Sequence, residues 1–81
     1  MLSAEAHLQW LVGMAEQARQ TEGVTSQTPI GAKDVALLKA HDAEVVYDGP
    51  QVGGRAHCTR LRYRGYVFYH AYMYTVAGLP C

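Results

Sequence analysis

Arginine and tyrosine side chains alternate through the last third of this 81-residue chain, and both types are suited to binding. Six of the eight aromatic residues lie between positions 63 and 74, close to Arg55, Arg60, Arg62 and Arg64. Arginine and tyrosine are enriched at the centres of protein interfaces, and the same pair stacks on the bases and neutralises the phosphates of single-stranded nucleic acid. The pattern therefore predicts a surface that binds a protein or a nucleic acid.

A thiol and two imidazoles in the same region are the residue types of a nucleophilic site. Cys58 follows His57 directly and would face His70 across a hairpin, but no acidic residue or asparagine follows Asp48 to orient the base. These side chains together with Cys81 are zinc-ligand types that lack the paired spacing of a zinc finger. We therefore expect a non-enzymatic protein with no catalytic residues, no metal and no cofactor.

The cysteine count and the N-terminal residues bear on the compartment. The chain has two cysteines, Cys58 and Cys81, and begins with MLSAEAHLQW, which lacks the basic segment of a secretion signal. Thiols stay reduced in the cytoplasm, so we expect a cytoplasmic protein with two free thiols. No apolar run reaches the roughly 18 residues of a membrane span, so no membrane contact is expected.

Charge is balanced over the whole chain and separated along it. Seven basic and seven acidic residues give a net charge of zero, which argues against a polybasic nucleic-acid binder. Residues 1–48 hold seven acids and three bases, a charge of −4, whereas residues 49–81 hold four bases and no acid, a charge of +4. The two halves therefore offer surfaces of opposite sign.

Two helices and three strands account for most of the sequence. An apolar stripe at four-three spacing predicts a helix over 3–21 with Ser3 as its N-cap and Gly23 as its stop. Residues 22–31 are predicted to be a loop, and a second helix is predicted over 32–41. Thr28 is expected to open this helix, because Pro29 follows it and proline is tolerated at a first helical position. The strands are expected at 43–48, 55–63 and 66–76. This order predicts one α+β domain over 1–81, with both helices on one face of a three-stranded antiparallel sheet.

The turn at Arg64 and Gly65 decides which side chains of the last hairpin face outward. A two-residue turn pairs Tyr63 with Tyr66 but requires a positive φ at Arg64, which a long side chain resists. A three-residue turn with Gly65 in the left-handed region pairs Arg62 with Tyr66 and avoids that strain, so it is the one we favour. Its open face would display Arg60, Arg62, Tyr66, Phe68, His70 and Tyr72.

The sequence favours a small protein-binding module, of the kind that mobile elements or phages use to block a site on a larger host complex, as anti-CRISPR proteins do. Small size, the missing catalytic constellation and the arginine–tyrosine hairpin support this expectation. The expected partner-binding residues are Arg60, Arg62, Arg64, Tyr66, Phe68 and Tyr72. A second-choice surface comprises Trp10, Glu16, Glu22, Asp42 and Glu44.

Three alternatives remain open at this point. The same hairpin face could bind RNA or single-stranded DNA. A ribonuclease toxin that depends on His70 is a second alternative, although such domains carry more positive charge. An aromatic open face could also be the seam of a homodimer.

Overall fold

The first helix, α1, spans Ala4–Glu22, close to its predicted range. In the computed structural model, which describes residues 3–50 and 57–71, the Ala6 amide donates a hydrogen bond to the Ser3 hydroxyl at 3.1 Å and so caps the first turn. Gly23 follows the last turn with a φ of +93°, a conformation that favours glycine. Both predicted ends of this helix are confirmed.

The second helix, α2, spans Ala32–Ala40, and its N-cap is Gly31 rather than the predicted Thr28. The Gly31 amide donates to the Asp34 carboxylate at 2.9 Å, so a side chain in the first turn satisfies a backbone donor outside it. The helix and its predicted range are therefore confirmed, and only the assignment of Thr28 as its opening residue is wrong.

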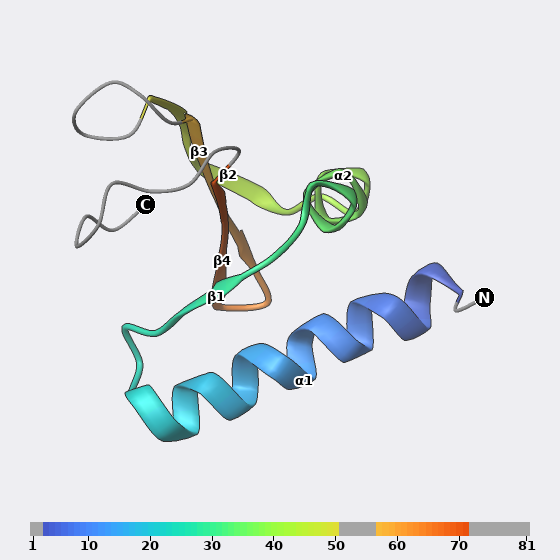
Figure 1. Cartoon of the computed structure of the whole chain (residues 1–81). Coiled ribbons are helices and arrows are strands. Elements are labelled where there is room, and N and C mark those ends of the chain that lie inside the picture. The colour runs from blue at the N-terminus through green and yellow to red at the C-terminus, as the bar shows by residue number, and fades with distance from the viewer. Residues whose placement is uncertain (1–2, 51–56, 72–81) are drawn as a thin grey trace.

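The sheet has four strands in the order β1-β4-β3-β2 (Figure 1). The strands are β1 at Gln27–Pro29, β2 at Glu44–Pro50, β3 at His57–Tyr63 and β4 at Tyr66–Ala71. β1 runs parallel to β4, and the other neighbours are antiparallel. The α+β class is confirmed, but the predicted three-stranded antiparallel sheet is wrong because a fourth strand joins it in parallel. The ends of the predicted strands at 55–56 and 72–76 lie outside the described residues.

β1 lies in the segment that the sequence predicts to be a loop. Thr28 is buried opposite Phe68, and the Ile30 amide donates to the Tyr69 carbonyl at 2.8 Å just beyond the strand. A three-residue strand that contains a proline fits only at a sheet edge and has no periodicity to detect. Pairing with β4, rather than local propensity, makes this segment a strand.

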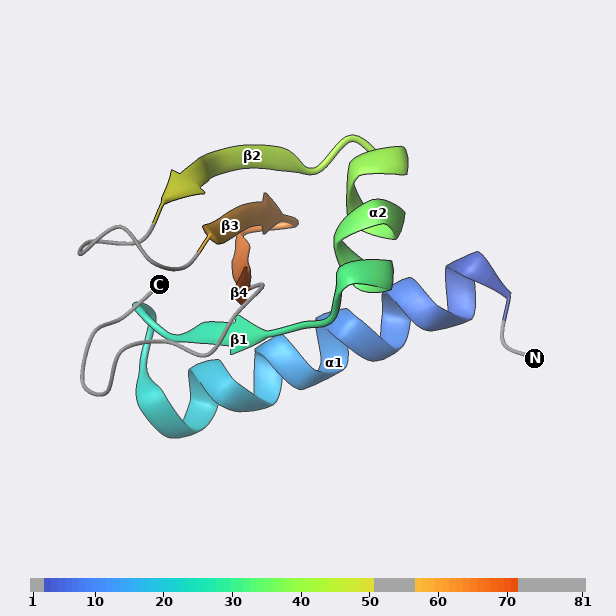
Figure 2. The same cartoon turned by 45° about the horizontal axis from the view of Figure 1, so that its top comes forward.

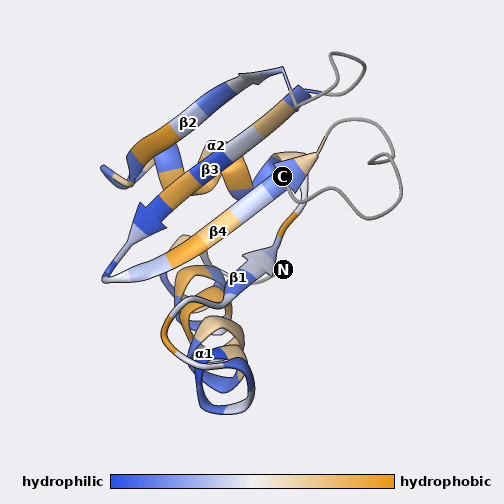
Figure 3. Ribbon diagram, turned by 90° about the vertical axis from the view of Figure 1, so that its left-hand side faces the viewer, coloured by the Kyte–Doolittle hydropathy of each residue, from blue (hydrophilic) through white to orange (hydrophobic). Residues whose placement is uncertain are grey.

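Both helices pack on the same face of the sheet. α2 connects β1 and β2, which are the two edges of the sheet, while α1 lies along the β1 and β4 side (Figure 2). The buried apolar side chains come from α1, α2, β3 and β4, and they are Leu8, Leu11, Ala15, Val35, Leu38, Leu61 and Phe68. The opposite face, which we call the outer face, is turned toward the viewer in Figure 3 with α2 behind it.

The hairpin between β3 and β4 adopts the register that the sequence analysis disfavoured. Tyr63 lies opposite Tyr66 and Leu61 opposite Phe68, so the predicted pairing of Arg62 with Tyr66 is wrong. Arg64 takes a φ of +52° and Gly65 a φ of +80°, the two positive values that a type I′ turn needs. Burial of Leu61 and Phe68 together in the core outweighs the local strain at one arginine.

Candidate binding surface

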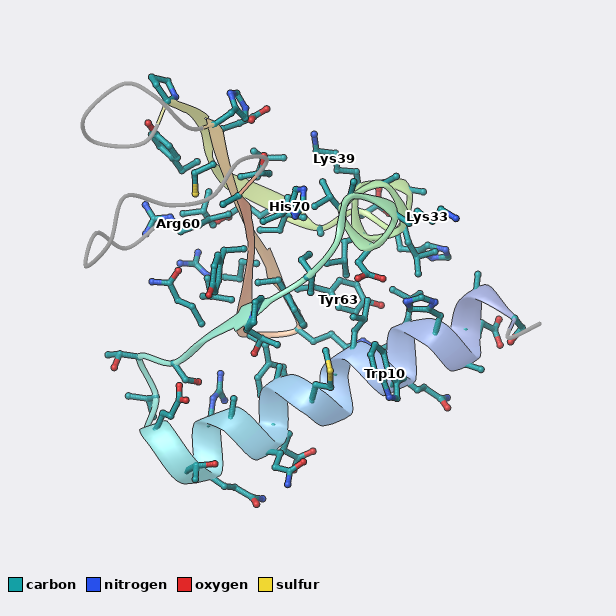
Figure 4. The ribbon with its side chains drawn as sticks, viewed as in Figure 1. Trp10, Lys33, Lys39, Arg60, Tyr63 and His70 are labelled. Carbon is teal, nitrogen blue, oxygen red and sulfur yellow. The ribbon has the colours of Figure 1, made fainter. Side chains whose placement is uncertain are left out.

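The centre of the outer face is a row of three side chains from three neighbouring strands. Arg60 on β3 lies opposite Tyr47 on β2 and opposite Tyr69 on β4, so its guanidinium has an aromatic residue on either side. The Arg60 guanidinium carbon is 5.6 Å from the centre of the Tyr47 ring, within the range of a cation–π contact. Figure 4 shows Arg60 on the opposite side of the sheet from Tyr63 and His70.

Tyr47 is held along its own strand. Its hydroxyl donates to the Pro50 carbonyl, and its ring lies over Gly49, where an added Cβ would be 3.3 Å from the hydroxyl oxygen. Glycine at this position therefore lets the ring lie flat beside Arg60. Tyr47 keeps 37% of its surface exposed, which leaves it open to a partner.

One donor of Arg60 is buried without an acceptor. The Nε atom is inaccessible to solvent and makes no hydrogen bond within the described part of the chain. A buried polar group without a partner costs about 1–3 kcal/mol, and more when the group is charged. Among residues 3–50 and 57–71, this donor is the buried side-chain group of the outer face that lacks a hydrogen-bond partner.

In a second row beside it, the charge of the arginine is already neutralised by a carboxylate. Arg62 donates from Nη1 to Glu44 Oε2 at 2.8 Å across β3 and β2, and both side chains are more than half exposed. Val67 lies opposite Arg62 on β4. The two arginines of β3 therefore differ, because Arg62 has a carboxylate partner and Arg60 does not have one among the described residues.

The one-residue difference in register changes which residues of β4 face outward. Arg60 and Arg62 are on the outer face as expected, but Val67 and Tyr69 accompany them instead of Tyr66 and Phe68. Phe68 is fully buried in the core, so its assignment as a binding residue is wrong. Tyr66 faces the helices, where the Arg19 guanidinium lies 4.2 Å from its ring centre. Tyr72 lies outside the described residues.

The second-choice surface is not one continuous patch. Trp10 is 55% exposed and makes an edge-to-face contact with His7 at 5.8 Å between ring centres. Glu16 follows Trp10 by six positions, which places it about 120° away around a helix. Asp42 lies in the turn after α2, and Glu44 belongs to the outer face. Glu22, in the last turn of α1, is also exposed.

Asp48 forms a polar cluster with two residues of β3 on the other face. Its Oδ1 accepts hydrogen bonds from His57 Nε2 at 2.6 Å and from the Thr59 hydroxyl at 3.1 Å. These bonds favour the ionised carboxylate, and the His57 bond in particular lowers the pKa of Asp48 below its ordinary value. The sequence analysis missed this cluster because Asp48 and His57 are on different strands.

The thiol and imidazole groups considered for chemistry do not meet. His70 faces the helices, and its Nδ1 donates to the Ile30 carbonyl at 2.8 Å. Cys58 lies opposite Ala71 on the outer face, is buried, and is disulfide-bonded, so the predicted free thiol is wrong. Cys81 lies outside the described residues.

Within residues 3–50 and 57–71, no group of three or more histidine, cysteine or acidic side chains could hold a metal ion. Neither helix of this part of the chain is long and apolar enough to cross a membrane.

Comparisons with models of protein families, with curated proteins and with solved structures found no match to this chain. The binding surface is therefore argued from its geometry alone. Tyr47, Val67 and Tyr69 are the outer-face residues that sequence reasoning missed. The two-residue turn, which pairs Tyr63 with Tyr66, would have placed Val67 and Tyr69 on this face.

Proposed function

We propose that this chain is a small non-enzymatic protein-binding module that uses the outer face of its sheet. The observation that carries the proposal is the buried Nε of Arg60, which has no acceptor within the described residues. Tyr47 and Tyr69 flank this donor and supply rigid aromatic area. A rotation of the Arg60 side chain on binding would bring the donor to a carboxylate or carbonyl of a partner, and the partner would bury both rings, which is the make-up of an interface centre.

A protein suits this face better than a nucleic acid. Glu44 lies on the outer face and accepts from Arg62 at 2.8 Å, so one of the two arginines is already neutralised there. A phosphate backbone would approach that carboxylate at a cost in repulsion, and a single uncompensated arginine gives little counterion release. For these reasons we place RNA or single-stranded DNA second.

The role that we assign to this module is to cover a site on a larger host complex. A standard interface buries about 800 Å² of each partner, an area that a domain of 81 residues can supply from one face. An inhibitor needs no more than this, because occupying the site is enough to block it.

Affinity capture with matched variants tests the proposal. The tagged chain, Arg60→Ala and Tyr69→Ala would be incubated with nuclease-treated and untreated lysate of the encoding organism's host. Gln20→Ala, an exposed position on α1, serves as the control. We expect the natural chain to capture a protein whether or not the lysate is treated with nuclease. Gln20→Ala should capture the same protein, and neither Arg60→Ala nor Tyr69→Ala should capture it. Loss after nuclease treatment would favour the nucleic-acid alternative, and equal capture by Arg60→Ala would contradict the assigned face.

A further inference from the structure

The tip of the hairpin holds an arginine in a conformation that arginine rarely adopts. Arg64 has a φ of +52°, in the left-handed region, where asparagine or glycine is the usual occupant of this turn position. Strained residues persist where the surrounding structure fixes them, and they cluster at sites that clamp ligands. Arg64 is also one of the predicted binding residues that the outer face does not use, because it belongs to the turn.

Contacts from α1 fix this tip. Arg19 donates to the Gly65 carbonyl, and its guanidinium carbon lies 4.2 Å from the centre of the Tyr66 ring. Arg19 thus contacts both Gly65, the last residue of the turn, and Tyr66, the first residue of β4. The hairpin tip is therefore held against α1, and the exposed side chain of Arg64 extends from it.

Arg64 lines a groove between the hairpin and both helices. The groove has a volume of about 310 Å³, and Glu5, Leu8, Gln9, His41, Tyr63 and Arg64 line it. The Arg64 guanidinium carbon is 5.3 Å from the centre of the Tyr63 ring, which supports the charge from below. Figure 4 shows Tyr63 between α1 and α2. Leu8 and Tyr63 thus provide an apolar floor beneath charged walls.

The charged walls of the groove are not neutralised by the protein itself. Glu5 and Arg64 line the same groove, but neither forms a salt bridge within the described part of the chain. A purely anionic ligand would meet the Glu5 carboxylate, and a purely cationic ligand would meet Arg64. A ligand that carries both charges is complementary to both walls.

We propose that this groove docks a short polypeptide segment that carries one acidic and one basic side chain. The Arg64 guanidinium donates hydrogen bonds to the carboxylate of the segment, Glu5 accepts hydrogen bonds from its cation, and the aliphatic stems lie over Leu8 and Tyr63. The inference rests on the proposed function only in taking a polypeptide as the ligand, and it uses a surface separate from the outer face.

A direct titration tests the groove without the natural partner. A capped tetrapeptide of lysine, two glycines and glutamate would be titrated into the ¹⁵N-labelled full chain, followed by the amide resonances of Leu8, Gln9 and Tyr63. Two analogues carry glutamine in place of either the lysine or the glutamate. We expect the doubly charged peptide to bind about fivefold more tightly than either analogue, the size of one exposed ion pair.

Variants assign the effect to the two walls. Arg64→Asn keeps a residue suited to the turn and should weaken binding of the doubly charged peptide about fivefold, as should Glu5→Gln. Gln20→Ala, an exposed position on α1 that does not line the groove, should leave it unchanged. Equal affinity for all three peptides, tighter binding by Glu5→Gln, or no shift at the groove residues at the highest soluble concentration would overturn the inference. Such a failure leaves partner capture through Arg60 untouched, so the two proposals can fail separately.

Discussion

Tyr63 and Tyr66 lie directly opposite each other at the end of the β3–β4 hairpin, and that pairing sets the face of every residue in β4. A shift by one residue would exchange Phe68 and Tyr69 between the core and the outer face. The pairing requires Arg64 to adopt a positive φ. The hydrophobic core and the binding surface therefore both depend on the conformation of one turn.

Arg64→Asn should stabilise the fold. Left-handed backbone costs a residue such as arginine about 1–2 kcal/mol, while loss of the exposed contact with Tyr63 costs about 0.5–1 kcal/mol. We expect a net gain of about 0.5 kcal/mol in urea denaturation. Arg64→Ala loses the same contact without relieving the strain, so it should be the less stable of the two variants. If both variants had equal stability, strain at Arg64 would not be a significant cost.

Phe68 should affect stability and leave binding unchanged. Phe68→Ala removes a fully buried ring beside Leu61 and should lower the free energy of unfolding by about 3–5 kcal/mol. The milder Phe68→Leu should remain folded and keep its affinity for the captured partner. Weaker partner binding by a folded Phe68→Leu would show that this side chain reaches the partner after all.

Arg60 and Arg62 should contribute unequally to binding. Arg60→Ala should cost about 2 kcal/mol or more of binding free energy, because its guanidinium is enclosed by aromatic residues and lacks an acceptor. Arg62→Ala should cost less than about 1 kcal/mol, since Arg62 already has an exposed partner in Glu44. Calorimetric titration of the captured partner with both variants measures the difference. Equal losses of binding free energy for the two variants would mean that the Arg62–Glu44 ion pair breaks when the partner binds.

Asp48 should make the fold sensitive to acid. The hydrogen bond from His57 lowers the pKa of Asp48 in the folded chain, so between the folded value and the ordinary value of about 3.9 the unfolded chain binds more protons. This contribution is fully present above about pH 4 and is lost as the pH falls through the folded pKa. Denaturation midpoints at pH 5 and pH 3 should therefore differ more for the natural chain than for Asp48→Asn. Glu16→Gln, which alters an exposed carboxylate on α1, should behave as the natural chain does.

The disulfide at Cys58 should raise the stability of the chain. A disulfide typically contributes about 2–4 kcal/mol to the free energy of unfolding, so a reducing agent should lower the melting temperature of the natural chain. Cys58→Ser should match the reduced chain and show no further effect of reductant. Thiol titration of the unfolded, unreduced protein should find no free thiol. Detection of two thiols would instead support the reduced state expected in the cytoplasm.

Local signals in the sequence were sufficient for α1 and for the extent of α2, although they misplaced the cap of α2. The Ser3 cap, the apolar stripe through Leu8 and Leu11, and Gly23 all act within one or two turns, and each is confirmed. β1 could not be predicted this way, because Thr28 is in a strand only through its pairing with Phe68, forty positions later. A short window of sequence contains no signal for this strand, because burial against a distant partner determines it and local strand propensity does not.

The residues of the outer face were predicted in part for the same reason. Arg60 and Arg62 were placed correctly, because β3 has the same face in both registers considered. Tyr66 and Phe68 were misplaced, since the local preference of Arg64 was weighed more heavily than the burial of Phe68. The approach of Tyr47 to Arg60 depends on a bulge between Val45 and Tyr47, for which the sequence has no marker.

The parallel pairing of β1 with β4 has a consequence for how the chain is made. Residues 27–29 acquire their sheet neighbour only when residues 67–69 have been synthesised. Until then the apolar stripe of α1 lacks the β3 and β4 side chains against which it packs. The sheet can therefore close only after β4 has been made, and the closure of a loop of about forty residues slows that step.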